Sequence, residues 1–332
     1  MTHRRGALAA LAAAALLALA ALSLSVGAAP LPFAEVWDGL ARGEGVSGLI
    51  VRDIRLPRLL LSLSVGASLG LSGAAMQGLL RNPLAEPAVF GAPQAAALGA
   101  VIVLHLGFAH AASWALPAAA VAGALASVGA LFALAGRGAG VVALILVGLA
   151  LSSLAGAATS LVLNLSKNPF AITEIVFWLM GSFEDRSIRH VVMAAPFMGL
   201  GAALLLAQGR GYRALTLGEE TAQSLGVSVA RLRGATALGV ALCVGAGVAV
   251  SGAISFVGLA APFLARALVG GDPARALVPS ALIGAALLTG ADVAARLIPA
   301  TFEIKVGVLT ALIGAPLFLW LAWTRRAGEG PA

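Results

Sequence analysis

The sequence contains little charge. Only 11% of its 332 residues are charged, whereas 60% are hydrophobic, and a soluble domain usually carries about 25% charged residues. A soluble fold of this length has too small an interior to bury so much apolar surface. In a lipid bilayer, apolar side chains can face the lipid instead. The composition therefore excludes an ordinary soluble protein and indicates an all-α integral membrane protein.

Other scarcities exclude classes of function. A single cysteine, Cys243, cannot form an internal disulfide or a cysteine-based metal site. The two lysines, Lys167 and Lys305, are not in a glycine-rich phosphate-binding loop, so the chain does not bind ATP by that route. Metalloprotease and serine-hydrolase motifs are missing as well. No catalytic residue, metal site or cofactor is predicted, which argues against a membrane-embedded enzyme.

Apolar runs fill most of the chain and predict about ten membrane-spanning helices in a single permease domain, residues 1–332. The 41 glycines suit close helix contacts in a bilayer. The expected spans are 7–28, 58–80, 88–108, 114–135, 139–163, 190–208, 235–254, 256–270, 276–298 and 306–323. Between them, residues 29–57 predict a short amphipathic helix, because Phe33, Val36, Trp37 and Leu40 share helical spacing.

The basic residues set the expected orientation. A small majority of the 21 Lys and Arg residues fall on the inner side if the N-terminus is inside. Ten spans then leave both termini in the cytoplasm. The net charge of +7 does not indicate nucleic-acid binding, because the arginines are scattered between apolar spans.

The longest inner loop, about 209–234, predicts a short helix. Thr216 and Glu219 have the spacing of a capping box, and Gly226 can end the helix. A short cytoplasmic helix is suited to contact a soluble partner, although the pattern fits an ordinary surface connector equally well. On the same side, Pro83 and Pro87 interrupt residues 77–87. Asn82 and Leu84 are therefore candidates for a constriction of a pathway, the alternative being a plain tight turn.

On the outer side, Arg52, Arg55 and Arg58 recur every three residues. Such a repeat predicts an exposed arginine face suited to an acidic partner. Local pairing with Asp53 or lipid phosphate is the alternative. Asp292 and Arg296 lie four residues apart near a span end and can pair on one helix face.

Several segments, in order along the chain from about 50 to 323, resemble the FecCD family. They are residues 55–58, 77–87, 217–226, 251–259 and 306–316. Members of this family are permeases of type II ABC importers for ferric siderophores, haem and vitamin B12. The resemblance implies a ten-helix permease of the bacterial inner membrane that pairs with a second permease subunit, two cytoplasmic ATP-binding subunits, and a periplasmic or lipid-anchored binding protein.

The resemblance also implies roles for particular residues. Arg55, Arg58 and Arg296 match positions that meet acidic residues of the binding protein, and Asn82 and Leu84 match the cytoplasmic gate. The segment that resembles the coupling helix, which docks on the ATPase, comprises Leu217, Gly218, Glu219, Glu220, Ser224, Leu225 and Gly226.

Two positions depart from the family pattern. Phe263 stands where a histidine is common, and Lys305 where a proline is common. They weaken the transfer of substrate and docking detail. Residues 255–259 are similar to siderophore permeases, so a ferric siderophore is the expected cargo, with haem or vitamin B12 as alternatives. An ion-gradient-driven transporter is the rival class, but the spans lack buried acids apart from Asp292.

Overall fold

The computed structural model describes residues 2–27, 29–108, 114–136, 140–299 and 303–328, and within these ranges all regular structure is helical. The long or apolar helices are α1 (Thr2–Ser25), α4 (Leu56–Leu80), α5 (Ala92–His105), α7 (Ala115–Ala135), α8 (Val141–Leu165), α9 (Pro169–Leu179), α10 (Ile188–Ala207), α13 (Val229–Ser251), α14 (Val257–Val269), α15 (Pro273–Leu297) and α16 (Val306–Gly328). The short helices are α2 (Phe33–Ala41), α3 (Gly45–Leu49), η1 (Ile50–Arg55), η2 (Pro87–Phe90), α11 (Gly209–Leu215) and α12 (Glu219–Ser224).

Each of the ten predicted spans coincides with one helix, but the helices differ in reach. Among the described residues, six helical runs are long and apolar enough to cross a membrane: α7, α8, α10, α13, α15 and the continuous run Gly45–Leu80. By contrast, α5 has 14 residues and α14 has 13, which is about 20 Å of helix. A bilayer core is about 30 Å thick. Helix α14 matches the predicted span 256–270 to within one residue at each end, whereas α5 is shorter than the predicted span 88–108. Neither helix is long enough to cross the bilayer core, and irregular backbone precedes both.

The centre of the molecule is α4, which packs along α15, α14 and α13. Glycines permit this contact. A Cβ added to Gly66 would overlap the carbonyl oxygen of Gly284, and one added to Gly73 would overlap that of Gly258. In a membrane, where packing drives helix association, small residues allow backbones to approach in this way. The expectation that glycines suit close helix contacts is confirmed at these positions.

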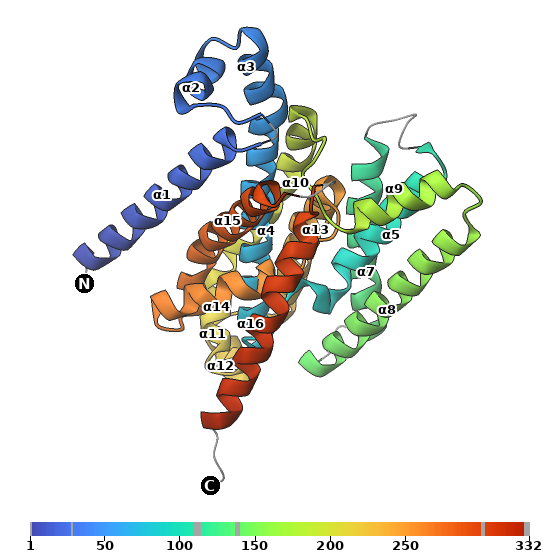
Figure 1. Cartoon of the computed structure of the whole chain (residues 1–332). Coiled ribbons are helices and arrows are strands. Elements are labelled where there is room, and N and C mark those ends of the chain that lie inside the picture. The colour runs from blue at the N-terminus through green and yellow to red at the C-terminus, as the bar shows by residue number, and fades with distance from the viewer. Residues whose placement is uncertain (1, 28, 109–113, 137–139, 300–302, 329–332) are drawn as a thin grey trace.

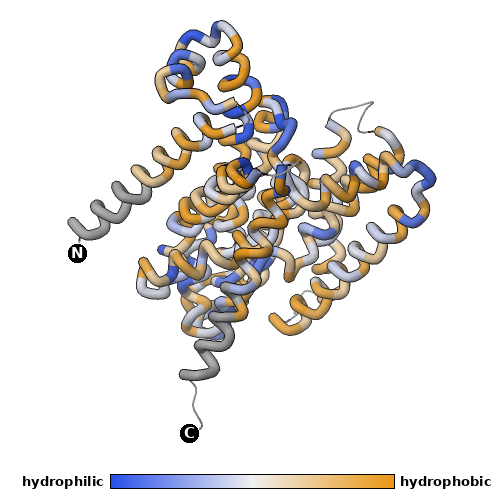
Figure 2. Tube along the Cα trace, viewed as in Figure 1, coloured by the Kyte–Doolittle hydropathy of each residue, from blue (hydrophilic) through white to orange (hydrophobic). Residues whose placement is uncertain are grey.

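Helix α8 contrasts with this centre. Its side chains are mostly apolar and uncovered, including Val142, Leu146 and Leu154. It lies at the side of the bundle in Figure 1, beyond α5 and α7. Figure 2 shows hydrophobic residues along most of α8, with hydrophilic ones at the end that leads to α9. Such a face requires lipid or another protein against it.

The bundle has two ends that differ in structure. At one, which we call the α3 end, α2 and α3 form a cap above the bundle; at the other, the α12 end, α11 and α12 extend beyond it (Figure 1). The predicted short helix is confirmed as α2, but of its apolar residues only Val36 is buried, whereas Phe33 and Trp37 are exposed. Helix α1 runs toward the α3 end, and α16 runs away from it (Figure 1).

Candidate functional site

The backbone between α4 and α5 turns sharply, as its prolines predict. Arg81 ends α4 in the left-handed region, with φ of 50°. The backbone N–H of Leu84 donates to Oδ1 of Asn82 at 2.9 Å, a side-chain turn of the kind that asparagine often makes. Both Asn82 and Leu84 are exposed. The turn is confirmed, and the gating role of these two residues stays a prediction.

A second irregular segment joins α13 to α14. It begins at Gly252, with φ of 70°, and ends at Phe256, with φ of 67°. A bulky residue in the left-handed region is rare and costs free energy. It is retained here at the point where α14 starts inside the bundle. Irregular backbone at membrane depth is tolerated where it is buried in protein or lines a cavity.

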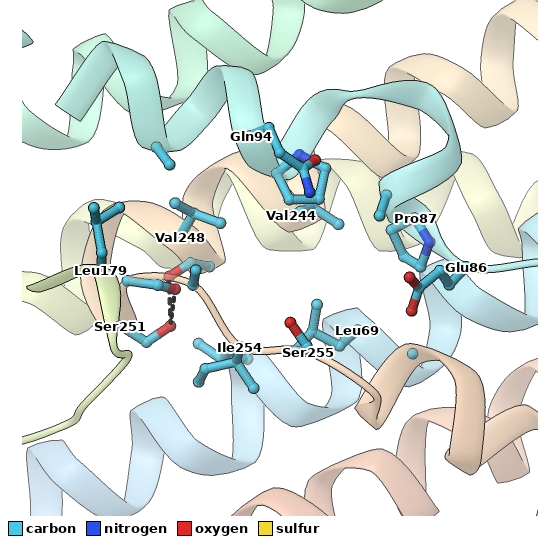
Figure 3. Close-up of a pocket in the computed structure, with 18 of the residues that line it drawn as sticks. Leu69, Glu86, Pro87, Gln94, Leu179, Val244, Val248, Ser251, Ile254 and Ser255 are labelled. Atoms are coloured by element: carbon cyan, nitrogen blue, oxygen red, sulfur yellow. Dashed lines mark hydrogen bonds between the residues drawn. The ribbon is translucent and has the colours of Figure 1, made fainter. Parts of the chain in front are cut away.

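A cavity of about 240 Å³ lies between these two segments. Residues 86–88 and Gln94 border it from the α5 side, residues 251–256 from the α14 side, and Gly156 and Thr159 from α8. Figure 3 shows the carboxylate of Glu86 and the amide of Gln94 turned toward the space that Ser251, Ile254 and Ser255 border from the other side. Below, we call this space the central cavity.

The second candidate site is at the α3 end and contains the three predicted docking arginines, Arg55, Arg58 and Arg296, which we call the arginine cluster. Arg55 donates to the carbonyl oxygens that end α1: to Leu24 at 2.6 Å, to Ser25 at 2.9 Å, and also to Ala29. A cation is favourable at the C-terminus of a helix, where carbonyls lack partners. Arg55 therefore fixes α1 to the start of α4.

Arg58 and Arg296 share one buried acid. Arg58 Nη2 donates to Asp292 Oδ1 at 2.8 Å and also pairs with Glu303. Arg296 Nη2 lies 3.1 Å from Asp292 Oδ2, which confirms the predicted pair on one face of α15. Arg296 also donates to the carbonyl oxygens of Ser23 and Val26, both at 2.8 Å. The cluster thus connects α1, α4, α15 and residue 303.

The prediction of an exposed arginine face is wrong for two of its three members. Arg55 is 4% exposed and Arg58 is 8% exposed, whereas Arg52 is exposed and donates to the carbonyl oxygens of Leu40 and Ala41. The reason is that carbonyls and acids of this same chain bind the first two. The arginine cluster nevertheless borders an open cavity of about 700 Å³, together with Asp53, Glu184, Asp185, Arg186 and Glu303. Docking of a partner there remains a prediction.

At the α12 end, residues 216–227 form what we call the α12 segment. The predicted short helix is confirmed as α12, although its cap differs from the prediction. Thr216 donates to the carbonyl oxygen of Arg213 at 2.7 Å, and Gly218, with φ of 101°, precedes the helix without a side-chain cap. Glu219 pairs instead with Arg233 at 2.7 Å. Gly226, with φ of 85°, lies just past the end of the helix, as predicted.

The apolar residues of the α12 segment are uncovered. Leu217 and Leu225 are each 63% exposed. They border a hollow of about 290 Å³ together with Arg210, Arg213, Ala214 and Val227. A leucine pair beside basic residues at the tip of a membrane bundle is suited to contact a soluble protein surface. Docking of an ATPase there is not tested by these observations.

Lys305, which departs from the family pattern, has a defined place. Its Nζ pairs with Glu184 and lies 5.7 Å from the centre of the Phe177 ring. It thus ties the start of α16 to the segment after α9. Sequence reasoning missed this pair, as it missed Glu303 as a partner of Arg58 and the shared cavity of Glu86 and Gln94. Among the described residues, no group of three or more His, Cys, Asp or Glu could hold a metal ion.

Comparisons with known proteins decide the family. The chain matches the FecCD transport family over residues 15–324. It belongs to that family. It is 41% identical to an Fe(3+) dicitrate transport system permease protein of Escherichia coli, with 92% of this chain and 95% of that one aligned. It is 38% identical to a hemin transport system permease protein of Yersinia pestis, with 92% and 91% aligned.

Other relatives and a solved structure agree. The chain is 39% identical to a vitamin B12 import system permease protein of Yersinia enterocolitica, over 82% of this chain and 81% of that protein. A solved structure of a metal-chelate type ABC transporter, in an inward-facing conformation, has a TM-score of 0.85 and 32% identity, and covers 94% of this chain and 97% of its own. The chain is therefore a multi-pass membrane permease of the ABC importer class, with the all-helical fold of that class.

Proposed function

We propose that this permease carries a metal chelate, specifically a ferric siderophore, across the bacterial inner membrane in a transporter driven by ATP. The observation that carries the proposal is the central cavity, where two helices that are too short to span the membrane begin beside irregular backbone. The relatives support the cargo class, since they are named for Fe(3+) dicitrate, hemin and vitamin B12. Haem and vitamin B12 are the alternative cargoes.

The assembly we propose has a second permease subunit, two cytoplasmic ATP-binding subunits and a periplasmic or lipid-anchored binding protein. The uncovered apolar face of α8 supports the permease contact, because two such faces would cover each other. The exposed Leu217 and Leu225 of the α12 segment support ATPase docking at that end. With the α12 end in the cytoplasm, both chain termini are cytoplasmic.

Docking of the binding protein is proposed at the arginine cluster, by insertion rather than by contact with an exposed face. An acidic side chain that enters the 700 Å³ cavity would meet Arg55, Arg58 and Arg296. It would also meet Arg186, whose Nε is buried without a hydrogen-bond partner in the described structure. The incoming carboxylate would then compete with Asp292 and Glu303 for charge-assisted bonds. Asn82 and Leu84 would line the cytoplasmic gate.

Reconstitution tests this function. The purified permease alone in lipid vesicles is expected to hydrolyse no ATP. Together with its ATP-binding subunits and binding protein, it is expected to take up a radiolabelled ferric siderophore only when ATP is supplied. Uptake by the permease alone, driven by a proton or sodium gradient, would show a secondary transporter instead and would overturn the proposal.

A further inference from the structure

The central cavity has an unbalanced charge. Of the described residues that line it, Glu86 is the single charged one, and no Lys, Arg or His is among them. Four other carboxylates have a cationic partner: Asp292 and Glu303 pair with Arg58, Glu184 with Lys305, and Glu219 with Arg233.

The Glu86 carboxylate has no such partner. Within the described part of the chain it takes part in no ion pair and no side-chain hydrogen bond. Glu86 precedes η2, where an acid often caps the helix, yet no side-chain cap bond is made. Capping therefore does not account for it. Glu86 is half-buried. A carboxylate that is partly removed from water and has no protein donor is poorly stabilised, so a positive or donating group beside it would be favourable.

The hydrogen bonds around the cavity show which polar groups remain free to bind a ligand. Ser251 Oγ already donates to the carbonyl oxygen of Gly247 at 2.8 Å, and Thr159 Oγ1 donates to that of Ala155 at 2.9 Å. Both hydroxyl groups therefore offer only lone pairs to the cavity. Gln94 Oε1 is buried and has no partner in the described structure. Gln94 Nε2 and Ser255 Oγ also border the cavity and can donate, so the lining offers acceptors and donors, and what it lacks is a positive charge.

We propose that the central cavity binds a positively charged, hydrogen-bond-donating arm of the transported chelate, and that the permease therefore favours cationic over anionic metal chelates. The inference rests on the proposed function, which places the cavity on the transport path. The volume of 240 Å³ is below the roughly 300–1,000 Å³ of pockets that enclose a whole ligand. It is sufficient for an arm, with the chelate body outside the cavity.

The test uses one chelate in three charge states. Ferrioxamine B is a ferric trihydroxamate with a pendant ammonium group; N-acetylation makes it neutral, and N-succinylation makes it anionic. Equilibrium binding of each radiolabelled complex is measured on the permease with its ATP-binding subunits in lipid nanodiscs, without the binding protein. Omitting the binding protein ensures that the measured selectivity belongs to the membrane complex.

The expected order is cation, then neutral, then anion, with about tenfold tighter binding of the cation than of the anion, which corresponds to about 1.4 kcal/mol. Glu86→Gln is expected to bring the three within about twofold. Glu44→Gln, which removes an exposed acid at the start of α3, is the matched control and is expected to keep the wild-type order.

The wild-type order alone decides the inference if Glu86→Gln fails to fold. Equal binding of the three complexes, preference for the anion, or no binding of any would overturn it. ATP-driven uptake of a ferric siderophore by the complete transporter, measured in parallel, separates the two proposals. Uptake without charge preference leaves the importer function standing and removes the inference, whereas absence of ATP-driven uptake of any metal chelate removes both.

Discussion

The arginine cluster and the α12 segment are both predicted to bind partner proteins, yet they are built in opposite ways. In the cluster, guanidinium groups are buried and bound by acids and carbonyls of the same chain. In the α12 segment, the two leucines are exposed and nothing in the described structure covers them. A partner that binds the arginine cluster must replace hydrogen bonds and ion pairs within this chain by bonds to itself. A partner that binds the α12 segment only has to cover exposed leucines.

This difference has energetic consequences. Removing a buried charge leaves its partner unpaired and is costly to the fold. Changing an exposed leucine barely affects the fold but removes apolar contact from an interface. Variants at the α3 end should therefore change stability as well as docking, and variants at the α12 end should change docking alone.

The largest effect is expected for Arg58→Met. Asp292 is fully buried, so loss of Arg58 removes one of its two cationic partners and leaves Glu303 unpaired. We expect a loss of about 3–5 kcal/mol in the free energy of unfolding. The measurement is unfolding of the detergent-solubilised permease by heat or denaturant. Arg52→Met changes an exposed arginine three residues before Arg55; it is the control and should cost less than about 1 kcal/mol. Equal stability of the two variants would mean that the buried pairs contribute nothing to the fold.

A large functional effect without loss of stability is expected for Leu225→Asp. A charge in the centre of an apolar contact should reduce ATPase binding and ATP-driven uptake about tenfold or more, while the unfolding free energy changes by less than about 0.5 kcal/mol. Binding of the ATP-binding subunits to the permease in nanodiscs measures the first effect. Gln223→Asp places the same charge on an exposed polar position of α12 and should preserve coupling. Normal uptake with Leu225→Asp would show that the ATPase docks elsewhere.

A smaller effect, on the rate of binding-protein association, distinguishes docking in the arginine cavity from docking on the exposed surface at the α3 end. Arg55→Gln leaves only neutral carbonyls without a partner, so the protein should fold. Association with the binding protein should slow about tenfold at low salt and approach the wild-type rate as salt rises. Stopped-flow mixing measures the rate. Arg52→Gln should bind normally. If Arg52→Gln slows docking and Arg55→Gln does not, the partner contacts the exposed surface and not the arginine cavity.

Hydropathy and proline positions were sufficient to predict the helices and the turn at 82–87, because those features depend on local sequence and on the thickness of the bilayer. The same hydropathy overestimated the length of α5, whereas α14 was predicted to within one residue at each end. The irregular backbone at residues 252–256 depends on contacts that are distant in sequence, such as Gly252 against the carbonyl oxygen of Trp178. The local sequence does not predict these contacts.

The partners of the charged residues were the least predictable. Arg58 and Glu303 are 245 residues apart, so only the fold can place them together, and the three-residue spacing of Arg52, Arg55 and Arg58 wrongly indicated a common exposed face. The capping box at Thr216 failed for a different reason. Gly218 takes up the turn into α12, and this freed Glu219 to pair with Arg233. The spacing of Thr216 and Glu219 fits a capping box, but it also fits the observed arrangement, in which Gly218 makes the turn and Glu219 pairs with Arg233.

The smallest expected effect is at the α12 end and depends on pH. Asp272 caps α15 by accepting from the backbone N–H groups of Ala274 and Arg275, and it also accepts from Arg213 of α11. Partial burial alone would raise the pKa of Asp272, but these hydrogen bonds outweigh it, so the pKa lies below its ordinary value. The stabilisation is therefore present above the unfolded pKa of about 3.9 and is lost as the pH falls through the lower, folded value.

Because Arg213 is mostly exposed, we expect less than about 1 kcal/mol from this ion pair. Asp272→Asn retains the acceptor oxygen of the cap but not the charge. Unfolding of the two proteins is compared between neutral pH and the acid limit at which the complex stays soluble. The wild type should be slightly more stable than the variant at neutral pH, and the difference should vanish in acid. A difference that persists in acid would assign the effect to cap geometry instead of charge, and α11 would then be held to α15 by packing alone.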